Sequence, residues 1–221
     1  LHYSAAPVIG GVESVIQAHA DQFAAAGLPL TVIAGRGEAD AMPNGVDFIR
    51  IADLDTIDPE ITAATEILNS GQIPENFESL VYRLTEELRP LLSAFDHVIV
   101  HNVLTKHFNL PLTTALFRLM DEGTLKHTVA WCHDLTWSSP NSRSKVFASF
   151  PWDLLKKIHP NVTYVAISKQ RRDEVVKTFG ISSEKVFIVN NGVDPLPLLD
   201  LSPDGSTLID RLGLWDADLI L

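Results

Sequence analysis

Cysteine is almost absent from this chain of 221 residues, which contains only Cys132. A single cysteine cannot form an internal disulfide, and this favours a reducing compartment, so we expect a cytoplasmic protein. The residues around Cys132 are apolar, which predicts a buried, inert thiol rather than a nucleophile. The glycosylation sequon at Asn161 is therefore expected to be fortuitous.

Long apolar runs are also lacking. No run approaches about 18 consecutive apolar residues, and no basic stretch precedes an apolar one at the start, so neither a membrane span nor a secretory signal is predicted. Basic residues are few, with 17 Lys and Arg against 28 Asp and Glu, for a formal net charge of −11. Because nucleic-acid binding needs clustered cations, we expect no nucleic-acid partner and at most peripheral membrane contact.

Several catalytic motifs are missing, and each absence removes a class of function. The sequence has no G-x-G-x-x-G or Walker loop, so a dinucleotide-binding site and a P-loop NTPase lose their main support. It has no HExxH motif and no recognised ligand spacing, so no metal is expected. Neither a G-x-S-x-G elbow nor paired carboxylates along an apolar groove is present, which disfavours hydrolases.

The residues that are present indicate a folded chain in which strands alternate with helices. A helical stripe of apolar residues follows Gly11 and ends at Gly27. Later helices are expected around Leu80 to Phe95, where Pro90 should kink or restart the helix. Further helices are predicted near 110–121, near 152–158 and over 169–179, with a small helix inside the connection 52–75.

Apolar runs rich in Val and Ile predict the strands, which are "LTVIAG", "VDFIRI", "HVIVHN", "TVAWCHD", "TYVAIS" and "KVFIVNN", with "LHY" as the tail of a first strand whose beginning is missing. Buried parallel strands return through crossover helices. The fold class is therefore α/β, a doubly wound, mostly parallel, Rossmann-like sheet. We expect this domain to cover residues 1–193. Residues 194–221 are expected to be a connector that contains a helix at "STLIDRLGL" and ends in "LWDADLIL", the start of a further domain, or an edge strand of the same sheet.

Polar residues follow the predicted strands, where an open parallel sheet binds its ligands. They are Gly10, Gly11, His101, Asn102, His133, Asp134, Ser168, Asn190, Asn191 and Gly192. Each has an ordinary structural explanation, since Ser168 is a good helix N-cap and Asn-Gly is a turn. Together they predict one polar rim, where neutral imidazoles could both donate and accept hydrogen bonds.

The paired glycines precede a helix, whose free N–H groups and positive dipole end favour an anion such as phosphate. A tight turn explains them equally well. Glu13 would repel a phosphate if it pointed inward, so we expect it to point away or to accept hydrogen bonds from nearby donors.

The segments "PVIGGVESVIQAHADQFAAAGLPLTVIAG", "VAWCHDL", "YVAISKQRRDEV" and "KVFIVNNGVDP", in this order, resemble the N-terminal half of a GT-B glycosyltransferase of family 4. The resemblance covers residues 4–195. It implies a retaining hexosyltransferase whose N-terminal domain binds the acceptor, while an absent C-terminal domain binds a nucleotide-sugar donor. The expected partners are therefore that donor and a hydroxyl-bearing acceptor, with no cofactor and no essential metal.

The resemblance also implies roles for individual residues. Gly10 and Gly11 would lie near the donor diphosphate, and His133 would reach the transferred sugar or the acceptor as the catalytic residue. Weaker matches, which rest on strand-end position, assign acceptor or sugar binding to His101, Asn102, Asp134 and Ser168. Asn191 and Gly192 would lead toward the interdomain hinge.

The family's E-x7-E motif and diphosphate-binding basic pair belong to the second domain, so we expect this chain alone to be inactive. Glu78 and Glu86 have that spacing, but they lie on a predicted first-domain helix and are interpreted as a solvated face. Two alternatives stay open at this stage. One is half of a nucleotide-sugar epimerase, and the other is a non-catalytic sugar- or phosphate-binding domain. The sequence does not separate GDP-mannose from UDP-glucose as the donor.

Overall fold

The computed structural model describes residues 1–192 and 203–214. The chain divides into two compact units, Leu1–Asn190 and Asn191–Leu221, which are described separately. In the second unit one helix, α7 (Pro203–Leu212), is described, and it overlaps the helix predicted at "STLIDRLGL" but begins three residues earlier. The strand predicted at "LWDADLIL" and most of the predicted connector lie outside the described residues, so the domain assignment stays a prediction.

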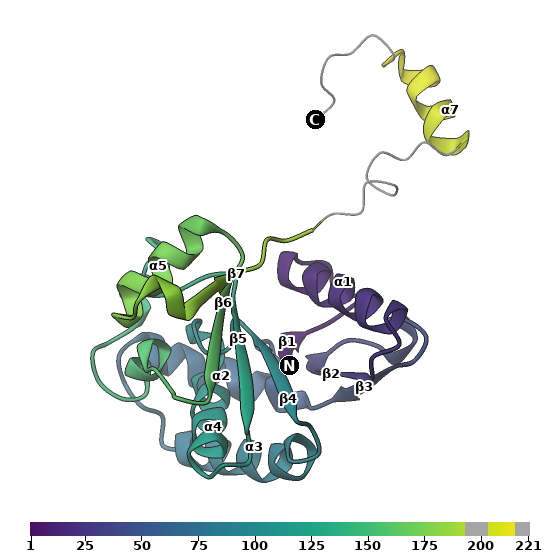
Figure 1. The fold of residues 1–221 in the computed structure, drawn as a ribbon. Helices are drawn as coiled ribbons and strands as arrows, with labels where there is room; N and C mark the ends of the chain where they lie inside the picture. The colour runs from purple at the N-terminus through teal and green to yellow at the C-terminus, as the bar shows by residue number, and fades with distance from the viewer. Residues whose placement is uncertain (193–202, 215–221) are drawn as a thin grey trace. The chain divides into compact units, whose positions relative to one another are not determined.

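The first unit is built on seven parallel strands (Figure 1). They are β1 (His2–Ser4), β2 (Leu30–Arg36), β3 (Val46–Arg50), β4 (His97–His101), β5 (His127–Cys132), β6 (Val162–Ala166) and β7 (Val186–Ile188). One set pairs in the order β1-β2-β3 and the other in the order β4-β5-β6-β7. Leu1 joins the two sets, because its N–H donates to Ile99 O at 2.6 Å and its carbonyl accepts from His101 N at 3.0 Å. The strand order across the unit is therefore 3-2-1-4-5-6-7.

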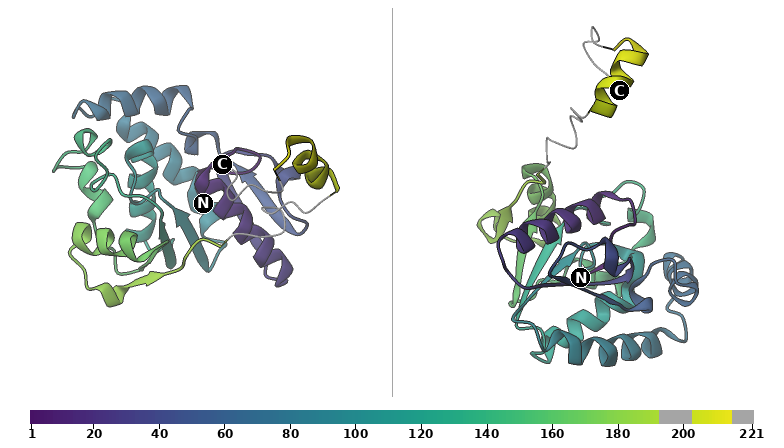
Figure 2. Two further views of the ribbon diagram at one scale, coloured as in Figure 1. Left: turned by 90° about the horizontal axis from the view of Figure 1, so that it is seen from above. Right: turned by 90° about the vertical axis from the view of Figure 1, so that its right-hand side faces the viewer.

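This order confirms the predicted doubly wound α/β fold. The direction of the winding reverses between β1 and β4, the position where open α/β sheets bind their ligands. Figure 1 places the N-terminus there, in the middle of the strands. The α-helices of the unit are α1 (Gly11–Ala25), α2 (Pro59–Asn69), α3 (Phe77–Leu92), α4 (Leu110–Asp121) and α5 (Lys169–Phe179). Figure 2 shows α1 on one face of the strands and α3 and α4 on the other.

Local sequence signals account for the helix ends. Gly27 follows α1 with φ +67, and Leu28 N donates to Phe23 O at 2.9 Å, so a left-handed glycine ends the helix as predicted. Asp58 caps α2 through the N–H groups of Glu60 and Ile61, with a proline at the first helical position. In α5, the Ser168 hydroxyl accepts from Arg171 N, and Gly180 ends the helix at φ +66.

Two helix predictions are wrong in part. The segment predicted as a helix over 152–158 is a short 3-10 helix, η5 (Trp152–Lys156). Pro151 precedes the segment and Pro160 follows it, which limits the length of any helix there. In so short a helix the few hydrogen bonds do not offset the entropy cost of nucleation. The restart predicted at Pro90 does not occur, since α3 continues to Leu92. Pro90 lies in the last turn, where the lost hydrogen bond is offset by the full burial of Leu88 and Leu92.

The remaining short 3-10 helices are η1 (Ala39–Ala41), η2 (Ala52–Leu54), η3 (His107–Asn109), η4 (Arg143–Lys145) and η6 (Ser183–Lys185). Directly after η2 the chain passes so close to β2 that a Cβ at Gly35 would lie 2.0 Å from Asp55 N. That position therefore requires glycine. The small helix predicted inside 52–75 is α2.

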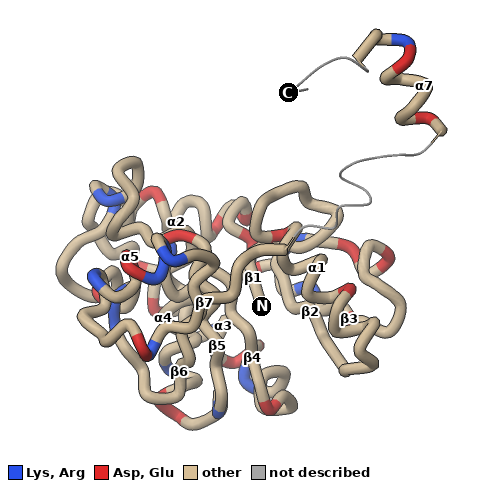
Figure 3. The backbone as a smooth tube through the Cα atoms, turned by 45° about the horizontal axis from the view of Figure 1, so that its top comes forward, with Lys and Arg blue, Asp and Glu red and all other residues tan. Residues whose placement is uncertain are grey.

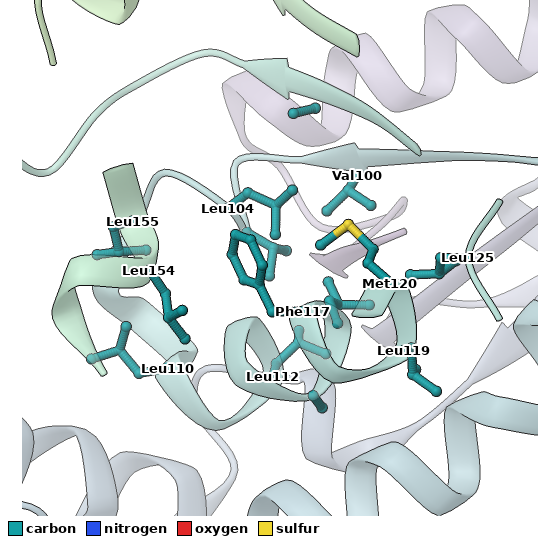
Figure 4. Packing of buried hydrophobic residues seen from close by; sticks show 14 of the residues in the cluster. Val100, Leu104, Leu110, Leu112, Phe117, Leu119, Met120, Leu125, Leu154 and Leu155 are labelled. Carbon is teal, nitrogen blue, oxygen red and sulfur yellow. The ribbon is translucent and has the colours of Figure 1, made fainter. Parts of the chain in front are cut away.

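The main core lies between the strands β4–β6 and the helices α3 and α4. Figure 4 shows the α4 side chains Phe117 and Met120 near Val100 and Leu104 of the β4 region, with Leu112 and Leu119 further from that strand. A smaller cluster packs α1 against β2, through Ile16, Ala20, Val32 and Ala34. Burial of these side chains removes apolar surface from water on both faces of the sheet, which fixes the carboxyl ends of the strands relative to one another.

The charges of the first unit are interspersed, as Figure 3 shows along α5. Glu78 and Glu86 lie exposed on α3 and form ion pairs with Arg118 and Arg89, which confirms the interpretation as a solvated face. In the part of the chain that the structure describes, no helix has the length and apolar character that a membrane crossing requires.

Candidate active site

Two of the predicted site histidines meet at the carboxyl end of the sheet. His101 ends β4 and His133 follows β5, and the Nδ1 atom of His101 lies 3.1 Å from the Nε2 atom of His133. The parallel register explains the contact, because His101 pairs with Trp131, two residues before His133. Both histidines are buried, at 4% and 5% exposure. Side chains from two different strands therefore form one pair.

Burial sets the charge of this pair. Loss of solvation lowers the pKa of His133 to about 4 and holds the pKa of His101 well below its ordinary value. Both rings are consequently neutral at pH 7. One proton lies between the two facing nitrogens, so the tautomer of one ring fixes that of the other. The Nδ1 atom of His133 is therefore left for another hydrogen-bond partner. Within residues 1–192 and 203–214, no residue forms a hydrogen bond with it.

Two further histidines surround the pair. The Nδ1 atom of His2 lies 2.8 Å from the carbonyl of His101, and a carbonyl can only accept, so this nitrogen carries a proton. His19, on α1, has its ring centroid 5.5 Å from that of His101 and 4.5 Å from that of Trp131. The buried Nδ1 of His19 and the Nε1 of Trp131 have no hydrogen-bond partner among the described residues. Such orphaned polar atoms indicate a place for a polar ligand or water.

Asn102 connects the two strand ends that carry the histidines. Its side-chain oxygen accepts from the backbone N–H groups of His133 and Asp134, at 2.9 and 3.0 Å. Its backbone has φ +59, the left-handed conformation that asparagine tolerates better than most residues. The side-chain oxygen is thus committed to holding the loop after β5. The sugar-binding role predicted for Asn102 stays a prediction.

We expect Asn102→Ala to lower the free energy of unfolding by about 1–2 kcal/mol, because the buried N–H of His133 and the partly buried N–H of Asp134 lose their acceptor and alanine is strained at positive φ. Urea unfolding measures the change. Asn102→Asp retains the acceptor and is the matched control. Equal stability of the alanine variant and the wild type would contradict this account.

The glycines begin α1, with Gly10 as the N-cap and Gly11 as the first helical residue. No side chain caps this end, and the N–H groups of residues 11–13 have no partner in the described part of the chain. A Cβ at Gly11 would meet nothing within 4 Å, whereas one at Gly10 would lie 2.2 Å from a carboxylate oxygen of Glu13. The helix end is open to a ligand at Gly11, while Glu13 folds back over Gly10.

Glu13 turns toward the sheet and accepts a hydrogen bond from the Ser4 hydroxyl at the end of β1. One of its oxygens lies 3.9 Å from the Nε2 atom of His2. The expectation that Glu13 finds nearby donors is confirmed by the Ser4 contact. Its carboxylate is thereby held beside the imidazoles.

Asp134 and Ser168 lie further along the same rim. Asp134 is exposed, and its carboxylate binds Arg171 at 3.0 Å. The hydroxyl oxygen of Ser168 accepts from Arg171 N at 3.1 Å as the α5 cap, the structural role that its position also predicts. Asn191 and Gly192 begin the second unit and are exposed, so their hinge role stays a prediction.

Cys132 and the surface hollows do not belong to this rim. Cys132 is fully buried, and burial raises the pKa of its thiol to about 12, so the predicted inert thiol is confirmed. One hollow follows the exposed side of α5, and another lies between α4 and η5. Within residues 1–192 and 203–214, no three His, Cys, Asp or Glu side chains are arranged to hold a metal ion.

Comparison with known proteins identifies the chain. The sequence profile of Glycosyltransferase Family 4 matches residues 9–195. The chain belongs to glycosyltransferase family 4. Among functionally curated proteins, none is similar enough in sequence to match it.

Two solved structures share the fold of this family 4 chain. One is WaaG, a glycosyltransferase involved in lipopolysaccharide biosynthesis, with 13% identity and a TM-score of 0.56 over 97% of this chain and 50% of WaaG. The other is a glycosyltransferase from Rickettsia africae ESF-5, with 17% identity and a TM-score of 0.53 over 96% of this chain and 50% of the other. The chain thus spans about half the length of the structures it matches. The predicted resemblance to the N-terminal domain of a GT-B enzyme is confirmed.

The sequence reasoning missed part of the rim. His19 lies within the apolar stripe of α1, and a histidine in such a stripe signals a polar contact at the helix face. His2 is the first residue of β1, and its burial follows from the place of β1 beside β4. Both bring imidazoles to the His101–His133 pair.

Proposed function

We propose that the complete protein is a retaining glycosyltransferase, which moves a hexosyl group from a nucleotide sugar to an acceptor hydroxyl. The observation that carries the proposal is the buried, neutral His101–His133 pair at the reversal point of the sheet, beside the open N-terminus of α1. Family membership favours transfer over the alternatives of an epimerase half and a non-catalytic binding domain.

His133 would contact the transferred sugar or the acceptor through its free Nδ1 atom. A neutral imidazole with its tautomer fixed by His101 presents one defined donor or acceptor, which orients a hydroxyl group. It would not act as a cationic acid at pH 7, because its pKa is about 4. His101 is therefore a positioning residue for His133, and this replaces direct sugar binding by His101 as our proposal.

The N-terminus of α1 would lie near the departing diphosphate. Its free N–H groups and the positive end of the helix dipole stabilise developing negative charge, and Gly11 presents no side chain to a group that approaches there. Attack by the acceptor from the same face as the leaving group would retain the anomeric configuration. Closure by a donor-binding domain would exclude water, which competes with the acceptor.

We also propose that the chain needs no cofactor or essential metal, and that residues 1–221 alone turn over no donor. The second proposal rests on the roles that the resemblance places in a second domain, namely the E-x7-E motif and the diphosphate-binding basic pair. Asp134 and Ser168 would line the acceptor side of the rim, and Asn191 and Gly192 would form part of the hinge. The site of action is proposed to be the cytoplasm.

The deciding experiment uses the full-length protein with a panel of UDP- and GDP-sugars and candidate hydroxyl acceptors, with and without EDTA. Product mass identifies the transferred sugar, and NMR of the anomeric proton identifies its configuration. We expect one nucleotide sugar to give an EDTA-insensitive product with retained configuration. An inverted product would refute the retaining mechanism, and steady donor consumption by residues 1–221 alone would refute the inactivity of this segment.

A further inference from the structure

Lys106 is a buried lysine at the rim. It lies in the loop that follows β4, and only 7% of the residue is exposed. Its Nζ atom lies 4.7 Å from the ring centroid of Phe108, and neither an ion pair nor a hydrogen bond joins this nitrogen to a residue that the structure describes. The stem of Lys106 is thus enclosed by protein, while its amine keeps access to solvent and has no carboxylate of the described residues in an ion pair with it, so it is available to an anion at the rim.

Hydrogen bonds fix Lys106 beside the loop that carries His133. The backbone N–H of Lys106 donates to Asn102 O at 2.9 Å, and the Thr105 hydroxyl donates to Asp134 O at 2.7 Å. On the other side, the His107 N–H donates to the Thr136 hydroxyl at 3.1 Å. The residues before and after Lys106 are thus both tied to the strand end after β5. Lys106 is held in the same rim as the histidine pair.

Other cations act on the same position. Burial lowers the pKa of Lys106, and the charges of Arg171 and Lys145 lower it further, while Asp134 alone opposes them. Lys145 also contributes, after burial and Lys106, to the low pKa of His107. Asp134 is itself neutralised by Arg171 at 3.0 Å, and Arg171 is further bound to Glu174. Arg171 thus holds both carboxylates in ion pairs, and neither of them forms an ion pair with Lys106.

We propose that Lys106, with Arg171 bound to Asp134 on the same rim, binds an anionic group of the acceptor, a phosphate or a carboxylate, at the edge of the candidate active site. The assignment of this anion to an acceptor substrate rests on the proposed transferase function. The inference adds the chemical class of that acceptor, which is anionic. A monoanion or dianion at Lys106 would supply the missing counter-charge. The donor diphosphate is assigned elsewhere, to the N-terminus of α1 that follows β1.

We expect one substitution at this site to weaken anion binding without lowering the stability of the fold. Lys106→Met removes a charge that forms no ion pair with a carboxylate of the described residues. The melting temperature of this variant is therefore expected to equal or exceed that of the wild type. The same change should weaken anion binding at least tenfold. Lys106→Arg retains the charge and should retain most of the binding. Lys126→Met is the matched control, because Lys126 is exposed and precedes β5 at the opposite end of the sheet.

Isothermal titration calorimetry of the full-length protein with inorganic phosphate, glucose 6-phosphate and glucose tests the proposal, each with and without saturating UDP or GDP. Vesicles of phosphatidylglycerol, with phosphatidylcholine as the reference, test a lipid headgroup as the source of the anion. Lys106-dependent binding of glucose 6-phosphate over glucose supports a soluble acceptor, and Lys106-dependent binding of the anionic vesicles supports a lipid acceptor.

The proposal is overturned if none of these anions binds, or if Lys106→Met binds them as the wild type does. It is also overturned if UDP or GDP displaces phosphate competitively, because the anion site would then be the donor site. These readouts need no turnover. Failure of the transfer assay with intact Lys106-dependent binding would therefore count against the proposed function and leave the anion site standing.

Discussion

Replacing His133 by alanine is expected to lower turnover of the complete enzyme at least tenfold, a loss of about 1.4 kcal/mol or more of transition-state stabilisation. The physical reason is that the variant loses the one nitrogen that the His101 contact leaves for a substrate. Positioned groups that donate or accept a hydrogen bond in the transition state are commonly worth a factor of about a hundred to a thousand, so tenfold is a lower bound. Steady-state kinetics with the donor identified from the panel measure the effect on kcat and KM separately.

Substitutions at His101 distinguish positioning from simple structural support. His101→Asn can place a nitrogen near the position of the ring Nδ1, whereas His101→Leu cannot, so the asparagine variant should retain more of kcat. KM for the donor should change little in both. His97→Asn, an exposed histidine at the start of β4, is the control. Wild-type kinetics in His133→Ala would return that residue to a purely structural role.

The sequence contained enough information to predict the rim but not its contacts. Polar residues after apolar strands identified the carboxyl edge, because parallel strands end at the same side of a sheet. The 3.1 Å contact between His101 and His133 depends on which strands are neighbours and on their register. Neither quantity is encoded in a local pattern, so the sequence could assign His101 only a general sugar-binding role.

Helix prediction succeeded where local signals agree and failed where tertiary packing decides. Ser168 and Gly180 bound α5 as a cap and a left-handed stop, and both are visible in the sequence. At Pro90 the local rule was overridden, because Leu88 and Leu92 are completely buried on the face of α3 that packs on the core. Lys106 escaped notice because a lone lysine in a loop is ordinarily exposed.

Acid is expected to destabilise the first unit through its buried histidines. Burial lowers the pKa of His133 and of His107 from 6.5 to about 4, so both are neutral in the folded state at pH 5 while the unfolded chain binds protons there. Stability is therefore fully present above pH 6.5 and is lost as the pH falls toward 4. Between pH 6.5 and pH 4, each of these two histidines lowers the free energy of unfolding by up to about 3 kcal/mol.

Urea unfolding followed by circular dichroism between pH 7 and pH 5 tests this expectation above the range in which most carboxylates titrate. His133→Gln should reduce the pH dependence of the unfolding free energy, because it removes one buried group that the unfolded state protonates preferentially. His127→Gln, at an exposed histidine at the amino end of β5, is the matched control. Stability that stays constant from pH 7 to pH 5 would mean that the His101–His133 rim admits enough water to charge its imidazoles, and the argument for a neutral His133 in transfer would fail with it.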